Sequence, residues 1–167
     1  MPRGVFFEAT ILWPGFLGQP QRKGTLLNNV AHNPNFRWGI SWICLALAIA
    51  LHVADEALTG FLPLYNAVVD EIRATYSWFP MPTFTFRTWL SALVSGVIIL
   101  LALSPFVFFG QVVMRYLSFF LSVVMIANAL GHVAVSVYLW TFAPGVYSSP
   151  FLFAAAVFLF SATRRAR

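Results

Sequence analysis

Charged residues are scarce in this sequence. Asp, Glu, Lys and Arg together make up 9% of the 167 residues, and hydrophobic residues make up 60%. A soluble domain carries about a quarter charged residues, so an ordinary soluble domain is excluded. Because a helix satisfies its backbone hydrogen bonds internally, the composition predicts an all-α, polytopic membrane protein.

Cysteine is almost absent too. Cys44 is the single cysteine, which excludes an intrachain disulfide and a metal site built from several thiolates. The net charge of +5 comes from ten basic and five acidic residues. The basic residues lie near the ends of apolar segments rather than in one cluster, so we expect the lipid bilayer as the partner and no nucleic acid.

Four apolar segments are long enough to predict a bundle of four transmembrane helices. They cover residues 38–60, 88–109, 116–140 and 150–162, and the last is near the minimum length. Residues 1–37 are interrupted by proline and glycine, which indicates a cytoplasmic or interfacial N-terminal arm before a membrane domain at 38–167. Residues 64–76 have an apolar face at helical spacing and predict a short amphipathic helix.

The basic residues also predict the orientation. Arg73 and Arg87 lie on one side of a four-span topology, and the other eight lie on the opposite side, as Arg3, Arg22, Lys23, Arg37, Arg115, Arg164, Arg165 and Arg167. Cytoplasmic loops are enriched in Lys and Arg, so we expect both termini in the cytoplasm.

Two of the predicted spans carry polar stripes. His52, Asp55 and Glu56 lie in the first span, and Asn128 and His132 lie in the third. Residues four apart share a helix face, so each span presents one stripe. Ionisable groups inside a bilayer are costly and mark functional sites, which makes these residues the candidate site.

The two histidines are expected at similar depth. Measured from the inner ends of two parallel spans, His52 lies about 21 Å and His132 about 24 Å along the helix, both in the outer half of the bilayer. Ser91 and Ser95, on the antiparallel second span, fall in the same half. We therefore expect Asn128, Ser91 and Ser95 to orient a substrate in the pocket.

Two kinds of chemistry fit these residues. In the first, His52, Glu56 and His132 bind a divalent metal, zinc or iron, which activates water. In the second, the two histidines with Asp55 and Glu56 share protons and catalyse an acid/base reaction. Either reaction would act on a lipid-like or small amphipathic molecule, in a polar cavity that we expect to open to the outer side.

Three alternatives remain open. The polar groups bind one another and only fasten the two helices. His52 and His132 ligate a haem between them. The protein is a non-catalytic subunit whose basic ends and aromatic faces contact other subunits of a larger membrane complex.

The order of these motifs resembles the HXXEE-motif family of small bacterial membrane proteins. The resemblance covers roughly residues 40–160 and rests on His52-Val53-Ala54-Asp55-Glu56, then Asn128 and His132, then Pro144-Gly145 before the final apolar segment. It departs at Asp55, where the motif has glutamate. The resemblance implies a protein of the bacterial inner membrane and supports the polar site, without implying a substrate or reaction. In its layout the chain is also similar to the sterol-isomerase-like emopamil-binding proteins.

Overall fold

A computed structural model describes residues 33–166, and all of its regular structure within that range is helical. The predicted arm therefore falls mostly outside the described residues. The six helices are α2 (Pro34–Thr59), α3 (Phe61–Thr75), α4 (Phe86–Ala102), α5 (Ser104–Phe108), α6 (Val112–Leu139) and α7 (Ser149–Arg165).

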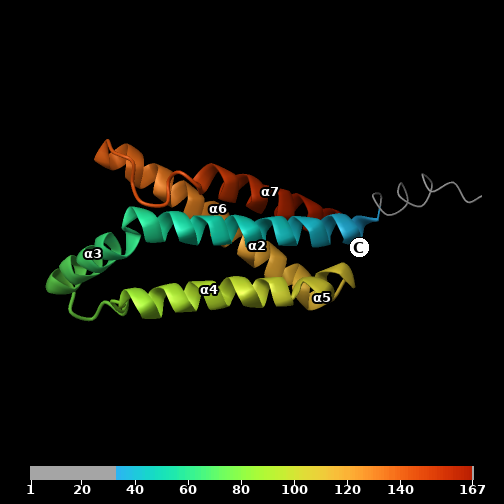
Figure 1. The fold of residues 1–167 in the computed structure, drawn as a ribbon, viewed down its shortest axis with the longest axis horizontal. Helices are drawn as coiled ribbons and strands as arrows, with labels where there is room; N and C mark the ends of the chain where they lie inside the picture. The colour runs from blue at the N-terminus through green and yellow to red at the C-terminus, as the bar shows by residue number, and fades with distance from the viewer. Residues whose placement is uncertain (1–32, 167) are drawn as a thin grey trace, which may run out of the picture.

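Helix α2 is the centre of the bundle. It packs against α7 on one side and against α4 and α5 on the other, and α7 also packs along α6 (Figure 1). Helix α3 continues from the far end of α2, while the start of α2 and the end of α7 lie together at the opposite end. The described chain therefore begins and ends at the same end of the bundle.

Three helical segments are long and apolar enough to cross a membrane. They are Pro34–Thr59, the α4–α5 segment Phe86–Phe108, and Val112–Leu139. The all-α class is thus confirmed, and by length and composition these three segments could cross a membrane. Helix α7 has 17 residues and is shorter than these three. Its Leu152, Ala156 and Leu159 are fully buried.

The bounds of α2 follow from local chemistry. Asn33 caps the helix by accepting hydrogen bonds from the backbone N–H groups of Asn35 and Phe36, so the helix starts earlier than the expected residue 38. Gly60 ends it in the left-handed conformation, with φ of 82°. Helix α3 then begins at once with Phe61. This sharp change of direction brings Phe61 beside His132, with ring centroids 5.5 Å apart.

Two buried tryptophans fix α2 against its neighbours. The indole N–H of Trp38 donates to the hydroxyl of Ser118 on α6 at 3.0 Å, and that of Trp42 donates to the carbonyl of Leu100 on α4 at 2.8 Å. A buried indole N–H needs a partner, so these bonds specify how far each helix slides along α2. They set the register that places the polar stripes of α2 and α6 at one level.

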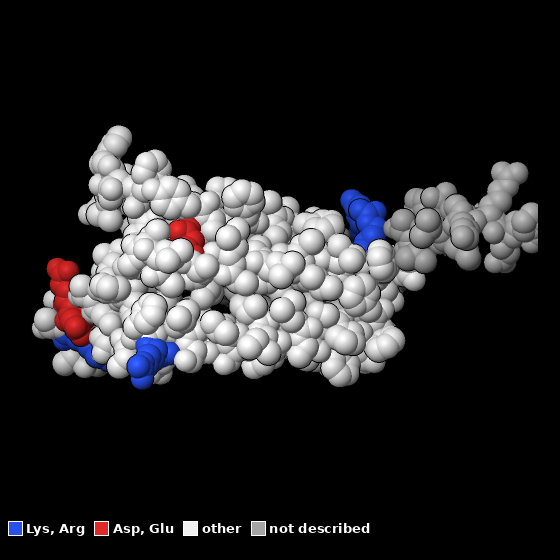
Figure 2. All heavy atoms as spheres, viewed as in Figure 1, with Lys and Arg blue, Asp and Glu red and all other residues white. Residues whose placement is uncertain are grey.

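Basic side chains lie near the ends of the bundle. On the face shown in Figure 2, Lys and Arg side chains lie near both ends, and a long region between them carries none. Arg115, at the start of α6, donates to the carbonyl of Ala166 at the end of α7. At the other end, Asp70, Glu71 and Arg73 lie on α3. This distribution, with an apolar band between polar ends, is what a bilayer requires.

Candidate metal centre

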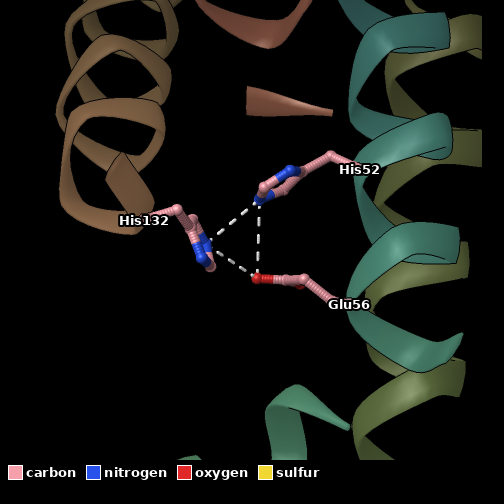
Figure 3. Close-up of side chains that lie close together, drawn as sticks. All are labelled: His52, Glu56 and His132. Atoms are coloured by element: carbon pink, nitrogen blue, oxygen red, sulfur yellow. Dashed lines mark hydrogen bonds and ion pairs between the residues drawn. The ribbon is translucent and has the colours of Figure 1, made fainter. Parts of the chain in front are cut away.

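Two imidazoles and one carboxylate converge between α2 and α6 (Figure 3). His52 Nε2 lies 3.2 Å from His132 Nε2 and 3.5 Å from Glu56 Oε1, and His132 Nε2 lies 3.1 Å from the same oxygen. All three side chains are at least nine-tenths buried. The cluster brings together the residues that the sequence predicted as metal ligands.

The remaining ring nitrogen of His132 is held by the backbone. His132 Nδ1 lies 2.6 Å from the carbonyl oxygen of Pro144, in the connection between α6 and α7. A carbonyl oxygen can only accept, so Nδ1 carries the proton and donates it. In a neutral imidazole this assignment leaves Nε2 as a lone pair directed at the cluster.

His52 is held by a chain of two side chains. The Ser148 hydroxyl donates to Asp55 Oδ2 at 2.7 Å, and the Ser148 backbone N–H donates to the same oxygen at 2.8 Å. Since the hydroxyl proton is directed to the carboxylate, its oxygen accepts from His52 Nδ1 at 2.8 Å. The neutral ring of His52 therefore also presents the lone pair of Nε2.

Three electron-pair donors thus face one another at a buried point. When both imidazoles are neutral, their two Nε2 atoms and the Glu56 carboxylate oxygen have no hydrogen among them to share. Buried acceptors in contact repel unless a cation lies between them. A metal ion satisfies all three at once, while a single proton on His132 Nε2 would have to be shared between Glu56 Oε1 at 3.1 Å and His52 Nε2 at 3.2 Å. The cluster therefore has the donor set and the second layer of partners that protein metal sites use.

Gly145 lets the connection reach the two rings. A Cβ atom there would lie 2.7 Å from His132 Cε1 and 3.1 Å from His52 Cε1. The backbone of Gly145 is also left-handed, with φ of 83°, which favours glycine. Its N–H donates to the hydroxyl of Thr59 on α2 at 3.3 Å. The connection is therefore part of the site and not a loop outside it.

A cleft of about 540 Å³ opens beside His132, between α3 and α6. Of the three residues in the cluster, His132 alone lines it. Asn128, one helical turn before His132, lines it as well, and its Oδ1 is buried with no hydrogen-bond partner among the described residues. The other lining residues are mostly apolar, as expected for the entry of an apolar molecule.

The structure does not bring every predicted residue into the cluster. Asp55 is next to Glu56 but turns to Ser148, so it orients His52 and lies outside the convergence point. Ser91 and Ser95 are exposed on α4 and are not among the residues that line the cleft. The hydroxyl at the site comes instead from Ser148, the last residue before α7, because the connection folds back between α2 and α6.

The sequence analysis missed Ser148, and it interpreted Pro144-Gly145 only as a motif of the resemblance. Ser148 lies in a Tyr-Ser-Ser-Pro turn that reads as an ordinary helix start. The Pro-Gly pair was the available signal, since Gly145 follows His132 by 13 residues, beyond the end of the same helix, and a glycine permits a close backbone approach.

Comparisons with protein-family models, with curated proteins and with solved structures find no match to this chain. The function is therefore inferred from the geometry of the site.

Two glycine substitutions measure how tightly the connection packs on the histidines. Gly60 and Gly145 are both left-handed, but a Cβ at Gly60 meets no atom within 4 Å. Gly60→Ala adds only the backbone cost, about 1–2 kcal/mol. Gly145→Ala adds the same cost and displaces two rings, for about 1–3 kcal/mol more. Thermal unfolding in detergent should therefore show the larger loss for Gly145→Ala. Equal losses would mean that the connection does not contact the rings.

Proposed function

We propose that this protein is an integral membrane metalloenzyme in which His52, Glu56 and His132 bind a zinc ion. The observation that carries the proposal is the convergence of three electron-pair donors whose hydrogens are committed elsewhere. Imidazole nitrogen and carboxylate oxygen are common zinc ligands, and catalytic zinc sites use three protein ligands with one position left open.

The distances within the cluster support zinc over an octahedral metal. Zinc bonds of 2.0–2.1 Å in tetrahedral geometry place ligand atoms about 3.3 Å from one another. Octahedral angles with bonds of similar length would place them about 2.9 Å apart. The three separations are 3.1, 3.2 and 3.5 Å. Non-haem iron uses the same two-histidine, one-carboxylate set, so it is the competing metal.

A haem does not fit this arrangement. Axial histidines approach the iron from opposite faces of the porphyrin. The rings of His52 and His132 meet edge to face with centroids 4.7 Å apart and with their Nε2 atoms 3.2 Å apart. A porphyrin plane has no space between them.

Different residues have different roles around the proposed zinc ion. A zinc ion with an open position would supply a polarising charge and an activated water. His132 connects the cluster to the cleft, so a molecule bound there lies beside the metal. The carbonyl of Pro144 and the Ser148–Asp55 pair hold the two rings in the tautomer that ligates. The walls of the cleft favour a lipid-like substrate.

The same residues connect the proposal to the resemblance. His52 and Glu56, the first and last residues of the His52-x-x-Asp55-Glu56 segment, supply two of the three ligands, and Asp55 supplies the orienting group. Membership of the HXXEE-motif family and a place in the bacterial inner membrane are parts of this proposal.

Metal analysis of the purified protein tests the centre. We expect about one zinc ion per chain in the unaltered protein. His52→Ala, His132→Ala and Glu56→Gln each remove a ligand, so each should lose more affinity than the 10–100-fold typical of an outer partner. Elemental analysis by mass spectrometry, after dialysis against a chelator, measures the zinc and iron content of each variant in one experiment.

The matched control is Glu71→Gln, which neutralises an exposed carboxylate on α3. It should retain the full metal content, and circular dichroism should show helical protein for every variant. A folded, metal-free protein in all preparations would contradict the metal centre and would favour proton sharing between the histidines and Glu56.

A second substitution tests the partner that orients His52. Ser148→Ala removes the acceptor of His52 Nδ1 and leaves all three proposed ligand residues in place, so zinc affinity should fall about 10–100-fold. Competition with a chelator of known affinity measures the change. Ser122→Ala, which removes a buried hydroxyl bonded to the carbonyl of Ser118, should leave zinc affinity unchanged. Equal effects of the two substitutions would show only a general loss of packing.

We also propose that α7 is a fourth membrane helix, so that both termini are cytoplasmic. Its 17 residues extend about 25 Å, from the level of the site to the end of the bundle where Arg37 and Arg115 lie. It begins deep in the bundle because the connection before it folds inward. Arg164 and Arg165 then lie on the same side as the other two arginines, as the positive-inside rule requires.

Two reporter fusions test this topology in a bacterial host. Alkaline phosphatase is active only outside the cytoplasm, and green fluorescent protein fluoresces when it folds inside. We expect active phosphatase for a fusion after Thr141 and a fluorescent fusion after Arg167. Both reporters on one side of the membrane would mean that α7 does not cross it.

A further inference from the structure

The cleft beside His132 has a mostly apolar lining with a few polar side chains. Its walls are one face of α3, one face of α6 and the start of the α6–α7 connection. Its volume of about 540 Å³ is within the range of small-molecule sites. The lining residues are Phe61, Leu64, Tyr65, Val68, Asn128, Gly131, His132, Val135, Tyr138, Leu139, Ala143 and Pro144.

The polar groups gather at one end of the cleft. Asn128 and His132 are one helical turn apart on α6, and Val135 and Leu139 continue the same face. From Asn128 to Leu139 this face runs about 16 Å along the helix. A molecule that fills the cleft therefore has a small polar group at one end and an apolar body along the rest.

The side chain of Asn128 has unused hydrogen-bonding capacity. Its Oδ1 is buried and has no hydrogen-bond partner among residues 33–166. A buried amide without a partner is costly, so a ligand group that pairs with it gains that energy on binding. A hydroxyl group both donates and accepts, and it can pair with either end of the carboxamide.

The side chains that line the cleft offer no charged partner to an ionised head group. None of the twelve residues that line the cleft is Lys, Arg, Asp or Glu. A phosphate or carboxylate that lies along the cleft, away from the proposed zinc ion, would therefore have no basic side chain as its partner. The hydroxyl of Tyr65 is also engaged, because it donates to the carbonyl of Pro82 at 3.0 Å.

We propose that this cleft binds a neutral lipid that carries a hydroxyl group. The hydroxyl pairs with Asn128 beside His132, and the apolar chain lies between α3 and α6 along Val135 and Leu139. The proposal rests on the proposed function for the part that zinc plays, since it places the hydroxyl-bearing carbon next to the metal centre. Binding itself depends on the cleft and on Asn128.

A photoreactive long-chain alcohol tests the location. Hexadecanol with a diazirine in its chain is added to the full-length protein in nanodiscs, irradiated, and its adducts are mapped by mass spectrometry. We expect adducts on Leu64, Val68, Val135 and Leu139. Excess hexadecanol should suppress them, whereas hexadecyl phosphate, which has the same chain and a charged head, should need about tenfold more to do so.

Gly131 provides a way to fill the cleft without disturbing its walls. A Cβ at Gly131 or at Gly96 meets no atom within 4 Å, but Gly131 lines the cleft and Gly96 lies on α4. Gly131→Leu should abolish the adducts in the cleft, and the matched Gly96→Leu should retain them. Equal labelling of the two variants would show simple partition of the probe into lipid and would overturn the proposal.

Asn128→Leu tests recognition of the hydroxyl group. The substitution keeps the volume of the side chain and removes its hydrogen bonds. In the unaltered protein, hexadecanol should compete with the probe better than hexadecyl methyl ether does. In Asn128→Leu this preference should fall about tenfold, as for the loss of one buried hydrogen bond, while the residues beside the apolar chain of the probe are still labelled. An unchanged preference for the alcohol would remove Asn128 from the proposal.

Metal content measured in the same samples separates this proposal from the metal centre. One zinc per chain with no adducts in the cleft would overturn the lipid site alone. Specific adducts on a metal-free protein would support the lipid site and contradict the zinc centre. Gly131→Leu should keep its zinc while it loses the adducts, which would show that the ion and the lipid occupy separate parts of one site.

Discussion

The arrangement of the site depends on two hydrogen bonds from imidazole Nδ1 atoms to the segment that joins α6 and α7. His132 donates to the carbonyl of Pro144, and His52 donates to the hydroxyl of Ser148. These bonds decide which nitrogen of each ring faces the cluster. Without them a neutral ring could rotate and donate to Glu56, and the three atoms would form an ordinary buried hydrogen-bond network.

The connection has to enter the bundle for these bonds to form, and its entry shapes the rest of the fold. Its backbone lies against both rings at Gly145, where no side chain fits. Helix α7 therefore starts at the depth of the site, and this explains why it has fewer residues than the three long apolar segments. A short last helix and a closely packed metal site have the same cause.

Much of the fold could be predicted from the sequence because apolar length and helical spacing are local properties. The all-α class, the long apolar helices and the short helix after the first of them depend on runs of residues that can be counted. The proximity of His52, Glu56 and His132 was also predictable, since spacing gave each stripe and helix rise gave the depth. Start positions were less accurate, because α2 begins at Pro34 through a cap at Asn33.

The finer parts of the site could not be predicted, because they depend on rotation about the helix axis and on the path of a connection. Depth alone placed Ser91 and Ser95 at the level of the histidines, but rotation of α4 exposes them. Asp55 and Glu56 are neighbours in sequence, yet the roughly 100° turn between adjacent helical residues sends one toward Ser148 and the other toward His132. A pattern of polar residues thus predicts where a site lies. The rotation of each helix and the path of the connection determine which side chains face the cluster and which orient the side chains that do.

The same physical reason links the metal centre and the cleft. A cation would satisfy the buried cluster of acceptors, and the cleft would give a molecule access to that cation. His132 is the one residue of the cluster that lines the cleft, and Asn128 adds an unpaired amide one turn away. Pure fastening of α2 to α6 would require neither an open cleft at His132 nor an unsatisfied amide within it. These two features favour a site that binds a ligand over a site that only holds helices together.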